Sequence, residues 1–104
     1  MTFEDLGLIE PLLKALAELG QHTPTDIQTQ AIPPALRGRD LIAASRTGTG
    51  KTASFALPLI QLLGDAPAAP ANSVHALVLV PTRELAQQVS DTLRSYTTHI
   101  RMRV

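Results

Sequence analysis

The chain has 104 residues, of which 44% are hydrophobic and 17% are charged, and its formal net charge is +0. This composition suits one small globular domain and excludes an intrinsically disordered segment. A neutral chain also excludes a general positive field for nucleic acid, and an aromatic content of 3% is too low for a base-stacking platform.

The sequence shows no signal for secretion or for a membrane. Cysteine is absent, which excludes disulfides and thiolate metal sites and is compatible with a reducing compartment. The N-terminal sequence MTFEDLGLIE is acidic and lacks the layout of a signal peptide. No apolar run approaches the roughly 18 residues that span a bilayer. We therefore expect a cytoplasmic protein that does not bind membranes.

Two helices are expected at the start of the chain. Residues 8–19 carry apolar side chains at helical spacing, and Gly20 suits the left-handed residue that follows a helix. Thr25 is expected to begin the second helix, because Gln28 stands three positions later, as in a capping box. The proline pair at 33 and 34 is expected to end this helix or to begin another short turn.

Apolar runs alternate with helical patterns in the remainder of the chain. Residues 41–44 and 76–80 are short apolar runs typical of buried strands, and residues 100–104 resemble the beginning of another. One helix is expected at 51–63, with a bend at Pro58, and another at 83–96. Between them, residues 64–73 are rich in Ala and Pro and predict a surface loop. This alternation predicts an α/β fold with a parallel sheet and flanking helices, truncated after about the third strand.

Residues 45–52, SRTGTGKT, lie between an expected strand and an expected helix, which is the context of a phosphate-binding loop. Glycines allow backbone N–H groups to point inward at phosphate oxygens, and the following helix adds its positive end. Lys51 would contact the β- and γ-phosphates, and the Thr52 hydroxyl suits Mg²⁺. The alternative is an ordinary Gly- and Thr-rich loop with a surface lysine. The nucleotide contacts expected here are Ser45, Arg46, Thr47, Gly48, Thr49, Gly50, Lys51 and Thr52; Lys51 and Thr52 are also the catalytic candidates, and Thr52 is the metal candidate.

Gln28 is a candidate reader of the base. Its amide offers a donor and an acceptor side by side, which matches the edge of adenine and not that of guanine. A site of this kind would bind ATP and reject GTP. The alternative is that Gln28 only completes the capping box with Thr25, and the two roles can coexist. Phe3, taken alone, is more typical of a core anchor than of a binding residue.

Residues 81–88, PTRELAQQ, follow an expected strand and open an expected helix. Ligands gather at the carboxyl ends of parallel strands, and a helix N-terminus with Thr82 and Arg83 can bind a phosphate group. The alternative is an ordinary capped helix with a surface arginine.

Together these segments resemble three motifs of DEAD-box RNA helicases, with the bacterial RhlE-like branch looking closest. Phe3 with residues 20–28 resembles the Q motif, residues 45–52 resemble motif I (AxTGxGKT), and residues 81–86, PTRELA, resemble motif Ia. The resemblance covers nearly the whole chain. It implies a P-loop NTPase (RecA-like) domain that uses ATP and Mg²⁺ to clamp RNA and unwind short duplexes locally.

The resemblance also implies roles for single residues. Gln28 would read adenine with support from Thr25 and Phe3, and residues 45–52 would hold the triphosphate and Mg²⁺. Pro81, Thr82 and Arg83 would contact the RNA sugar-phosphate backbone with low sequence specificity. Three positions depart from the family pattern: Gln21 stands where the family has an aromatic that stacks on adenine, Asp26 replaces a proline, and Ser45 replaces an alanine.

On this resemblance, residues 1–38 form a Q-motif helical segment and residues 39–104 form the first, incomplete part of the ATP-binding domain. The D-E-A-D and S-A-T segments and a second domain are not among these residues. We therefore expect the 104 residues alone neither to hydrolyse ATP nor to unwind RNA, and an open sheet edge would favour self-association. The alternatives are another P-loop NTPase or small-molecule kinase, and a non-catalytic nucleotide- or RNA-binding module.

Overall fold

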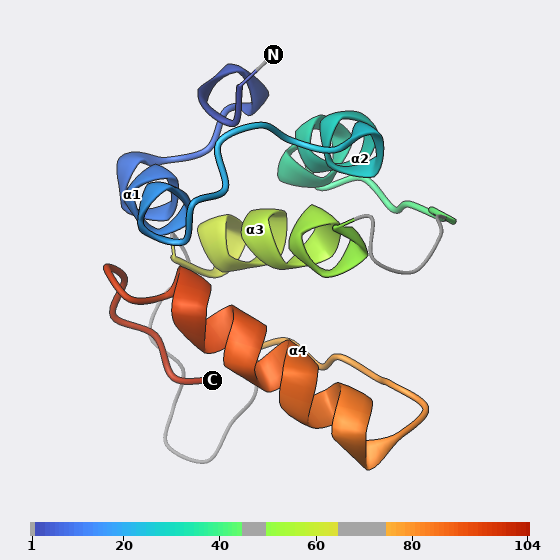
Figure 1. Ribbon diagram of the computed structural model, residues 1–104. Helices are drawn as coiled ribbons and strands as arrows, with labels where there is room; N and C mark the ends of the chain where they lie inside the picture. Colours follow the sequence, from blue (N-terminus) through green and yellow to red (C-terminus); the bar gives the residue numbers. More distant parts are fainter. Residues whose placement is uncertain (1, 45–49, 65–74) are drawn as a thin grey trace.

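The computed structural model of the chain describes residues 2–44, 50–64 and 75–104. Its elements are a short 3₁₀ helix, η1 (Glu4–Leu6), and the helices α1 (Glu10–Glu18), α2 (Asp26–Leu36), α3 (Lys51–Gly64) and α4 (Arg83–Tyr96). Figure 1 shows α1 and α2 on one side of α3 and α4 crossing on the other side. Helix α3 is therefore the central element.

The expected parallel sheet is not observed, because the described residues contain no strand. The prediction of an α/β, RecA-like sheet is therefore wrong for this structure. The segments expected to form strands are neither helix nor strand at residues 41–44, 76–80 and 101–104. In the second of them, Leu77 is 78% exposed and Leu79 is 84% exposed. A strand forms only when its N–H and C=O groups pair with a neighbouring segment. An apolar run predicts burial, but it specifies neither the neighbour nor the register of the pairing.

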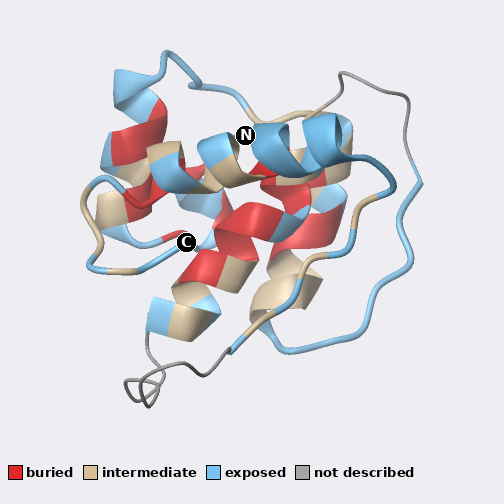
Figure 2. Cartoon of the chain, turned by 90° about the horizontal axis from the view of Figure 1, so that it is seen from below, coloured by how far each residue is buried: buried red, intermediate tan, exposed pale blue. Residues whose placement is uncertain are grey.

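The hydrophobic core forms where the helices face α3. The buried positions Ala53, Ala56, Leu57 and Ile60 follow helical spacing and line one face of α3. Figure 2 shows the buried residues gathered between the helices and the exposed residues on their outer turns. The core cluster contains Phe3, Leu6, Leu8, Leu12, Leu16, Ile32, Ala53, Ala56, Leu57, Ile60 and Tyr96. One core thus spans both sides of the division expected at residues 38 and 39.

The local signals for α1 and α2 are confirmed. Gly20, just after α1, has a φ of 74°, in the left-handed region. Thr25 caps α2 in a complete capping box with Gln28. The prediction that the proline pair ends this helix or begins another turn is wrong, because Pro33 and Pro34 lie inside α2. They sit in its last turns, and Pro34 still offers its carbonyl oxygen, which accepts hydrogen bonds from the backbone N–H groups that follow the helix.

The N-terminal segment is fastened to α3 by one glutamine side chain. Gln61 Nε2 donates to the Gly7 carbonyl at 3.0 Å, and Gln61 Oε1 accepts from the Ile9 N–H at 2.9 Å. One bond satisfies the N–H group of Ile9, the N-cap of α1, and the other satisfies the Gly7 carbonyl that precedes the helix. They fix η1 and α1 against the helix whose first turn carries Lys51.

Helix α4 begins and ends where the sequence predicts, at residues 83 and 96. Val89 and Tyr96 are buried and Leu93 packs against the core, so one face of the helix is anchored. Gly64 is the last residue of α3, and the expected loop beyond it lies outside the described residues. Among the helices that the structure describes, none has the length and apolarity needed to cross a membrane.

Candidate nucleotide-binding site

The first turn of α3 carries the described end of the predicted phosphate loop. Gly50 precedes the helix with a φ of 82°, Lys51 is its exposed first residue, and Thr52 is half-buried. Lys51 therefore adds a full positive charge at the end of the helix where N–H groups have no partner within the helix. The remaining predicted loop residues, Ser45, Arg46, Thr47, Gly48 and Thr49, lie outside the described residues.

The side chain of Gln28 joins the start of α2 to this loop. Gln28 Oε1 accepts from the Thr25 N–H at 2.9 Å, and Gln28 Nε2 donates to the Gly50 carbonyl at 3.1 Å. The capping role that the sequence left open is thus confirmed. A glutamine amide has two N–H donors and two acceptor lone pairs, so one of each remains for a ligand. The predicted base reader and the predicted phosphate loop are in direct contact.

Gly50 is needed at this contact for two physical reasons. Its left-handed backbone is strained for residues with a Cβ. A Cβ built on Gly50 would also lie 2.2 Å from Gln28 Nε2 and 3.3 Å from Thr25 Cγ2. The sequence identified both Gln28 and Gly50 but not their contact, because no local pattern links two residues so far apart in the chain.

Phe3 and Thr25, the other predicted base-side residues, occupy different environments. Phe3 is 4% exposed and belongs to the hydrophobic core. Its observed contribution is therefore packing, and a contact with nucleotide stays a prediction. Thr25 is half-buried, and its hydroxyl oxygen accepts from the Gln28 N–H at 3.4 Å. Thr25 thus holds Gln28 from the backbone side.

The predicted RNA contacts lie at the start of α4. Pro81, Thr82 and Arg83 are all exposed. Thr82 Oγ1 accepts from the Leu85 N–H at 3.1 Å and caps the helix. The capping alternative is therefore confirmed for Thr82, whose O–H can still donate to a ligand. Arg83 presents its guanidinium to solvent at a helix N-terminus, which suits a phosphate group.

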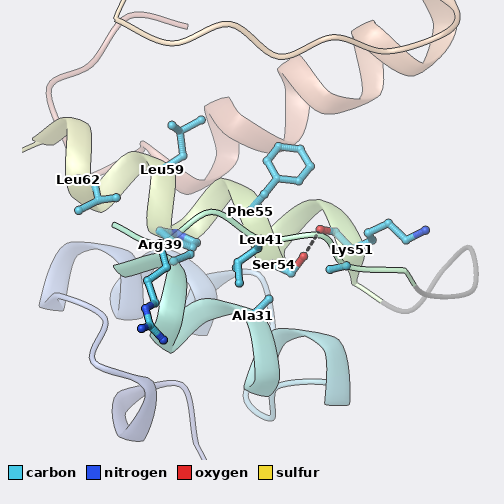
Figure 3. A pocket seen from close by; sticks show the side chains of 11 residues that line it. Ala31, Arg39, Leu41, Lys51, Ser54, Phe55, Leu59 and Leu62 are labelled. Carbon is cyan, nitrogen blue, oxygen red and sulfur yellow. Dashed lines mark hydrogen bonds between the residues drawn. The ribbon is translucent and has the colours of Figure 1, made fainter. Parts of the chain in front are cut away.

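A separate hollow of about 420 Å³ lies between α2, residues 39–43 and α3. Its lining is mostly apolar, with Ala31, Leu41, Phe55 and Leu59 among the contributors. Figure 3 shows the Lys51 side chain extending outward from the rim of this hollow. Apart from Arg39, Lys51 and Ser54, the described lining offers phosphate oxygens no polar side chain.

Thr52 is the only predicted protein ligand for Mg²⁺. Within the described ranges, no group of three or more His, Asp or Glu side chains could hold a metal ion. Mg²⁺ bound with a nucleotide takes few protein ligands, because phosphate oxygens and water complete its octahedron. A half-buried hydroxyl on the first turn of α3 fits that role.

The last turn of α4 contains a buried phenol. Tyr96 is 3% exposed, and its hydroxyl donates to Gln21 Oε1 at 3.2 Å. Burial raises the pKa of Tyr96 above its ordinary value of about 10, and the hydrogen bond with Gln21 only partly opposes this. The folded chain therefore keeps the Tyr96 proton at pH values where the unfolded chain releases it.

We predict that the chain loses stability as pH rises above about 10, because the unfolded state there binds fewer protons than the folded state. Below that pH, the contribution of the buried, protonated Tyr96 to the stability of the folded chain is fully present. Tyr96 is the only tyrosine and tryptophan is absent, so phenolate absorbance at 295 nm reports this residue alone. The folded chain should titrate at a higher pH than the chain in 8 M urea. Coincident titration curves would contradict the burial of Tyr96.

The chain is similar to known proteins over most of its length. A family model described as DEAD/DEAH box helicase matches residues 25–104. The chain is 52% identical over 95 residues to the RNA helicase CrhR of Synechocystis, covering 91% of this chain and 18% of that protein. It is 49% identical over 100 residues to the DEAD-box ATP-dependent RNA helicase RhpA of Helicobacter pylori, covering 96% of this chain and 19% of that protein.

Two solved structures share the fold. The ADP-bound RNA helicase Prp28 from Chaetomium thermophilum aligns with a TM-score of 0.85 and 42% identity, covering 91% of this chain and 23% of that one. A DEAD box protein from Methanococcus jannaschii aligns with a TM-score of 0.80 and 44% identity, covering 92% of this chain and 25% of that one. The chain spans about a fifth of the length of the curated relatives it matches.

Proposed function

The chain belongs to the DEAD/DEAH box helicase family, and we propose that it contributes the ATP-binding elements of an ATP-dependent RNA helicase. The observation that supports this best is the hydrogen bond from Gln28 to Gly50, which joins the predicted base reader to the predicted phosphate loop. Relatives named as RNA helicases and an ADP-bound structural neighbour support the same function.

In this proposal, each part of the site recognises one part of ATP. Gln28 uses its remaining N–H and lone pair to bind the N7 and N6 edge of adenine, while Thr25 holds it in place.

Lys51 neutralises charge on the β- and γ-phosphates, and the N-terminus of α3 adds backbone donors. The Thr52 hydroxyl would hold Mg²⁺, which would neutralise negative charge on the phosphates. Residues 45–49 complete the phosphate contacts, and Phe3 supports the segment from the core.

The RNA side of the proposal rests on the start of α4. Pro81, Thr82 and Arg83 would contact the sugar-phosphate backbone, which carries no base information, so sequence specificity would be low. A relationship with the RhlE-like branch and a cytoplasmic location are part of the same proposal. Residues 1–38 would then supply base recognition, and residues 39–104 would supply phosphate and RNA contacts.

Self-association is proposed on a basis different from the sheet edge expected from the sequence. The described residues contain no such edge, but the segments at 41–44 and 76–80 expose large apolar side chains, including Ile42, Leu77 and Leu79. Exposed apolar patches favour association with other chains. Sedimentation as a monomer at high concentration would contradict this part of the proposal.

Lys51→Ala is expected to weaken binding of a fluorescent ADP analogue by about 10- to 100-fold, because a charge-assisted hydrogen bond contributes about 1.5–3 kcal/mol. The matched control is Lys14→Ala, which removes an exposed lysine of α1 and should leave the affinity unchanged. Fluorescence titration measures both. Equal losses in the two variants would show that Lys51 acts only through general charge.

The same purified 104-residue chain is expected not to turn over ATP when RNA is added. Phosphoryl transfer needs a metal-bound carboxylate, a positioned water and added positive charge. The proposed site contains the phosphate cradle alone, with no acidic cluster for a metal in the described ranges. RNA-stimulated release of phosphate by this chain would contradict the prediction that these 104 residues lack the groups that phosphoryl transfer needs.

A further inference from the structure

A second set of contacts joins the end of α4 to the end of α1, away from the first turn of α3. The hydroxyl of Tyr96 donates to Gln21 Oε1, and His99 Nε2 contacts Glu18 Oε1. In Figure 1 the last turn of α4 lies beside α1. Both contacts connect residues that are more than 70 positions apart in the chain, at separations of 75 and 81.

Gln21 lies in the short connection, residues 19–25, that leads from α1 to the base-side residues. Thr25 follows at the end of this connection, and its N–H and hydroxyl hold Gln28. The residues between Gln21 and Thr25 are exposed or half-buried, so core packing restrains them weakly. Fixing the Gln21 side chain therefore limits the conformations open to the whole connection.

The Tyr96–Gln21 hydrogen bond depends on the identity of residue 21. The family resemblance implies an aromatic at this position, and a phenylalanine ring could not accept a hydrogen bond from the Tyr96 hydroxyl in the way that the amide oxygen does. Tyr96 is buried and Gln21 is exposed. A buried hydroxyl requires a partner, because a buried donor without a hydrogen bond is destabilising. The buried phenol thus holds the exposed glutamine in place.

We propose that Tyr96 is a positioning residue for the nucleotide site and acts through Gln21 on the connection that carries Thr25 and Gln28. This inference rests on the proposed function, because it assigns the connection to adenine recognition. Tyr96 itself does not touch the ligand. Its hydroxyl fixes the start of the connection, the capping box fixes the end, and Gln28 is thereby held in place against Gly50.

Tyr96→Phe is the informative substitution, because it removes the hydroxyl and keeps the buried ring. The partner left behind is exposed Gln21, which water can satisfy, so global stability should change little. Gln21→Ala would instead leave the buried Tyr96 hydroxyl without a hydrogen-bond partner. It would lower global stability as well as release the connection, so the two effects could not be separated. The matched control is Ser95→Ala, which removes a hydroxyl from the same turn of α4. Among the described residues, that hydroxyl donates its hydrogen bond within its own helix, to the Thr92 carbonyl.

The test combines amide hydrogen exchange over residues 21–28 in the free chain with titration by a fluorescent ADP analogue. Losing a hydrogen bond worth about 0.5–1.5 kcal/mol changes an equilibrium about two- to tenfold. Tyr96→Phe should therefore speed exchange in this segment and weaken analogue binding by about that factor, while Ser95→Ala changes neither. Neither substitution changes His99 or Glu18, so we expect their contact to persist and α4 to stay docked.

Two outcomes overturn the positioning role. The first is exchange over residues 21–28 that does not differ between Tyr96→Phe and Ser95→Ala. The second is faster exchange in Tyr96→Phe with unchanged analogue affinity, because the connection then moves without affecting the site. If the unsubstituted chain binds no analogue, the proposed function fails instead, and the exchange data still decide whether Tyr96 holds the connection.

Discussion

Gly50→Ala is expected to lower the free energy of unfolding by about 2–3 kcal/mol. A left-handed backbone costs a residue with a Cβ about 1–2 kcal/mol, and Gly50 has a φ of 82°. The new Cβ would also stand 2.2 Å from Gln28 Nε2, so the amide must move and its hydrogen bond with the Gly50 carbonyl is lost. That bond adds about 1 kcal/mol. Urea denaturation followed by circular dichroism measures the change.

Gly38→Ala is the matched control for this prediction. Gly38 has a φ of 78°, but a Cβ there meets nothing within 4 Å. Gly38→Ala should therefore lower the free energy of unfolding only by the backbone cost of about 1–2 kcal/mol. The difference between the two variants isolates the contact with Gln28. Equal losses would mean that Gln28 does not restrain the loop, and the site described above would lose its central contact.

Leu57→Ala is expected to lower the free energy of unfolding by about 2–5 kcal/mol, the range for removing a fully buried leucine. Leu57 is 0% exposed and lies on the face of α3 that forms the core. The free energy of unfolding of a native protein is about 5–15 kcal/mol, so this loss is a large fraction of the total. The same urea denaturation measures it.

Leu62→Ala separates burial from helix propensity, because it makes the same chemical change in the same helix. Leu62 is 43% exposed, so its truncation should cost clearly less. If Leu57→Ala does not fold, Leu57→Met keeps the volume and should cost less than about 1.5 kcal/mol. A loss for Leu62→Ala as large as that for Leu57→Ala would place the core elsewhere.

The helices and their caps could be predicted because their signals are local. Thr25 and Gln28 lie within one turn, so the capping box is visible in the sequence and is confirmed. Thr82 caps α4 in the same way, and the bounds of that helix match the prediction. The prediction at the proline pair was wrong because proline was expected to stop the helix. Instead, α2 includes Pro33 and Pro34 and ends at Leu36.

The sheet could not be predicted in the same way, because strand pairing is not local. The apolar character of residues 41–44 and 76–80 is real, yet the structure leaves Ile42 and Leu79 exposed. Whether such a run pairs depends on a partner whose backbone groups match in position. Composition carries no information about that partner.

The candidate site shows the same limit. Its residues were found by their chemistry, but the contacts that hold them join distant parts of the chain. Gln28 meets Gly50 across 22 residues, and Gln21 meets Tyr96 across 75. Tyr96 carries no motif signal, and only its burial beside a polar side chain reveals a role. The residues of the predicted loop at 45–49 lie outside the described structure, so their contacts stay predictions.

The central claim is that Gln28 reads adenine while it holds the phosphate loop. Competition of ATP and GTP against a fluorescent ADP analogue tests it most directly, in the unsubstituted chain, in Gln28→Ala and in Gln30→Ala. Gln30 is an exposed glutamine of the same helix and serves as the control. A ratio of two affinities is insensitive to partial unfolding, which matters because Gln28 is buried and caps α2.

We predict that ATP displaces the analogue about tenfold more effectively than GTP, because a correctly paired base edge contributes about 1–3 kcal/mol of discrimination. The preference should survive in Gln30→Ala and vanish in Gln28→Ala. Equal displacement by ATP and GTP in the unsubstituted chain would contradict the claim. Gln28 would then be a helix cap and a loop contact only.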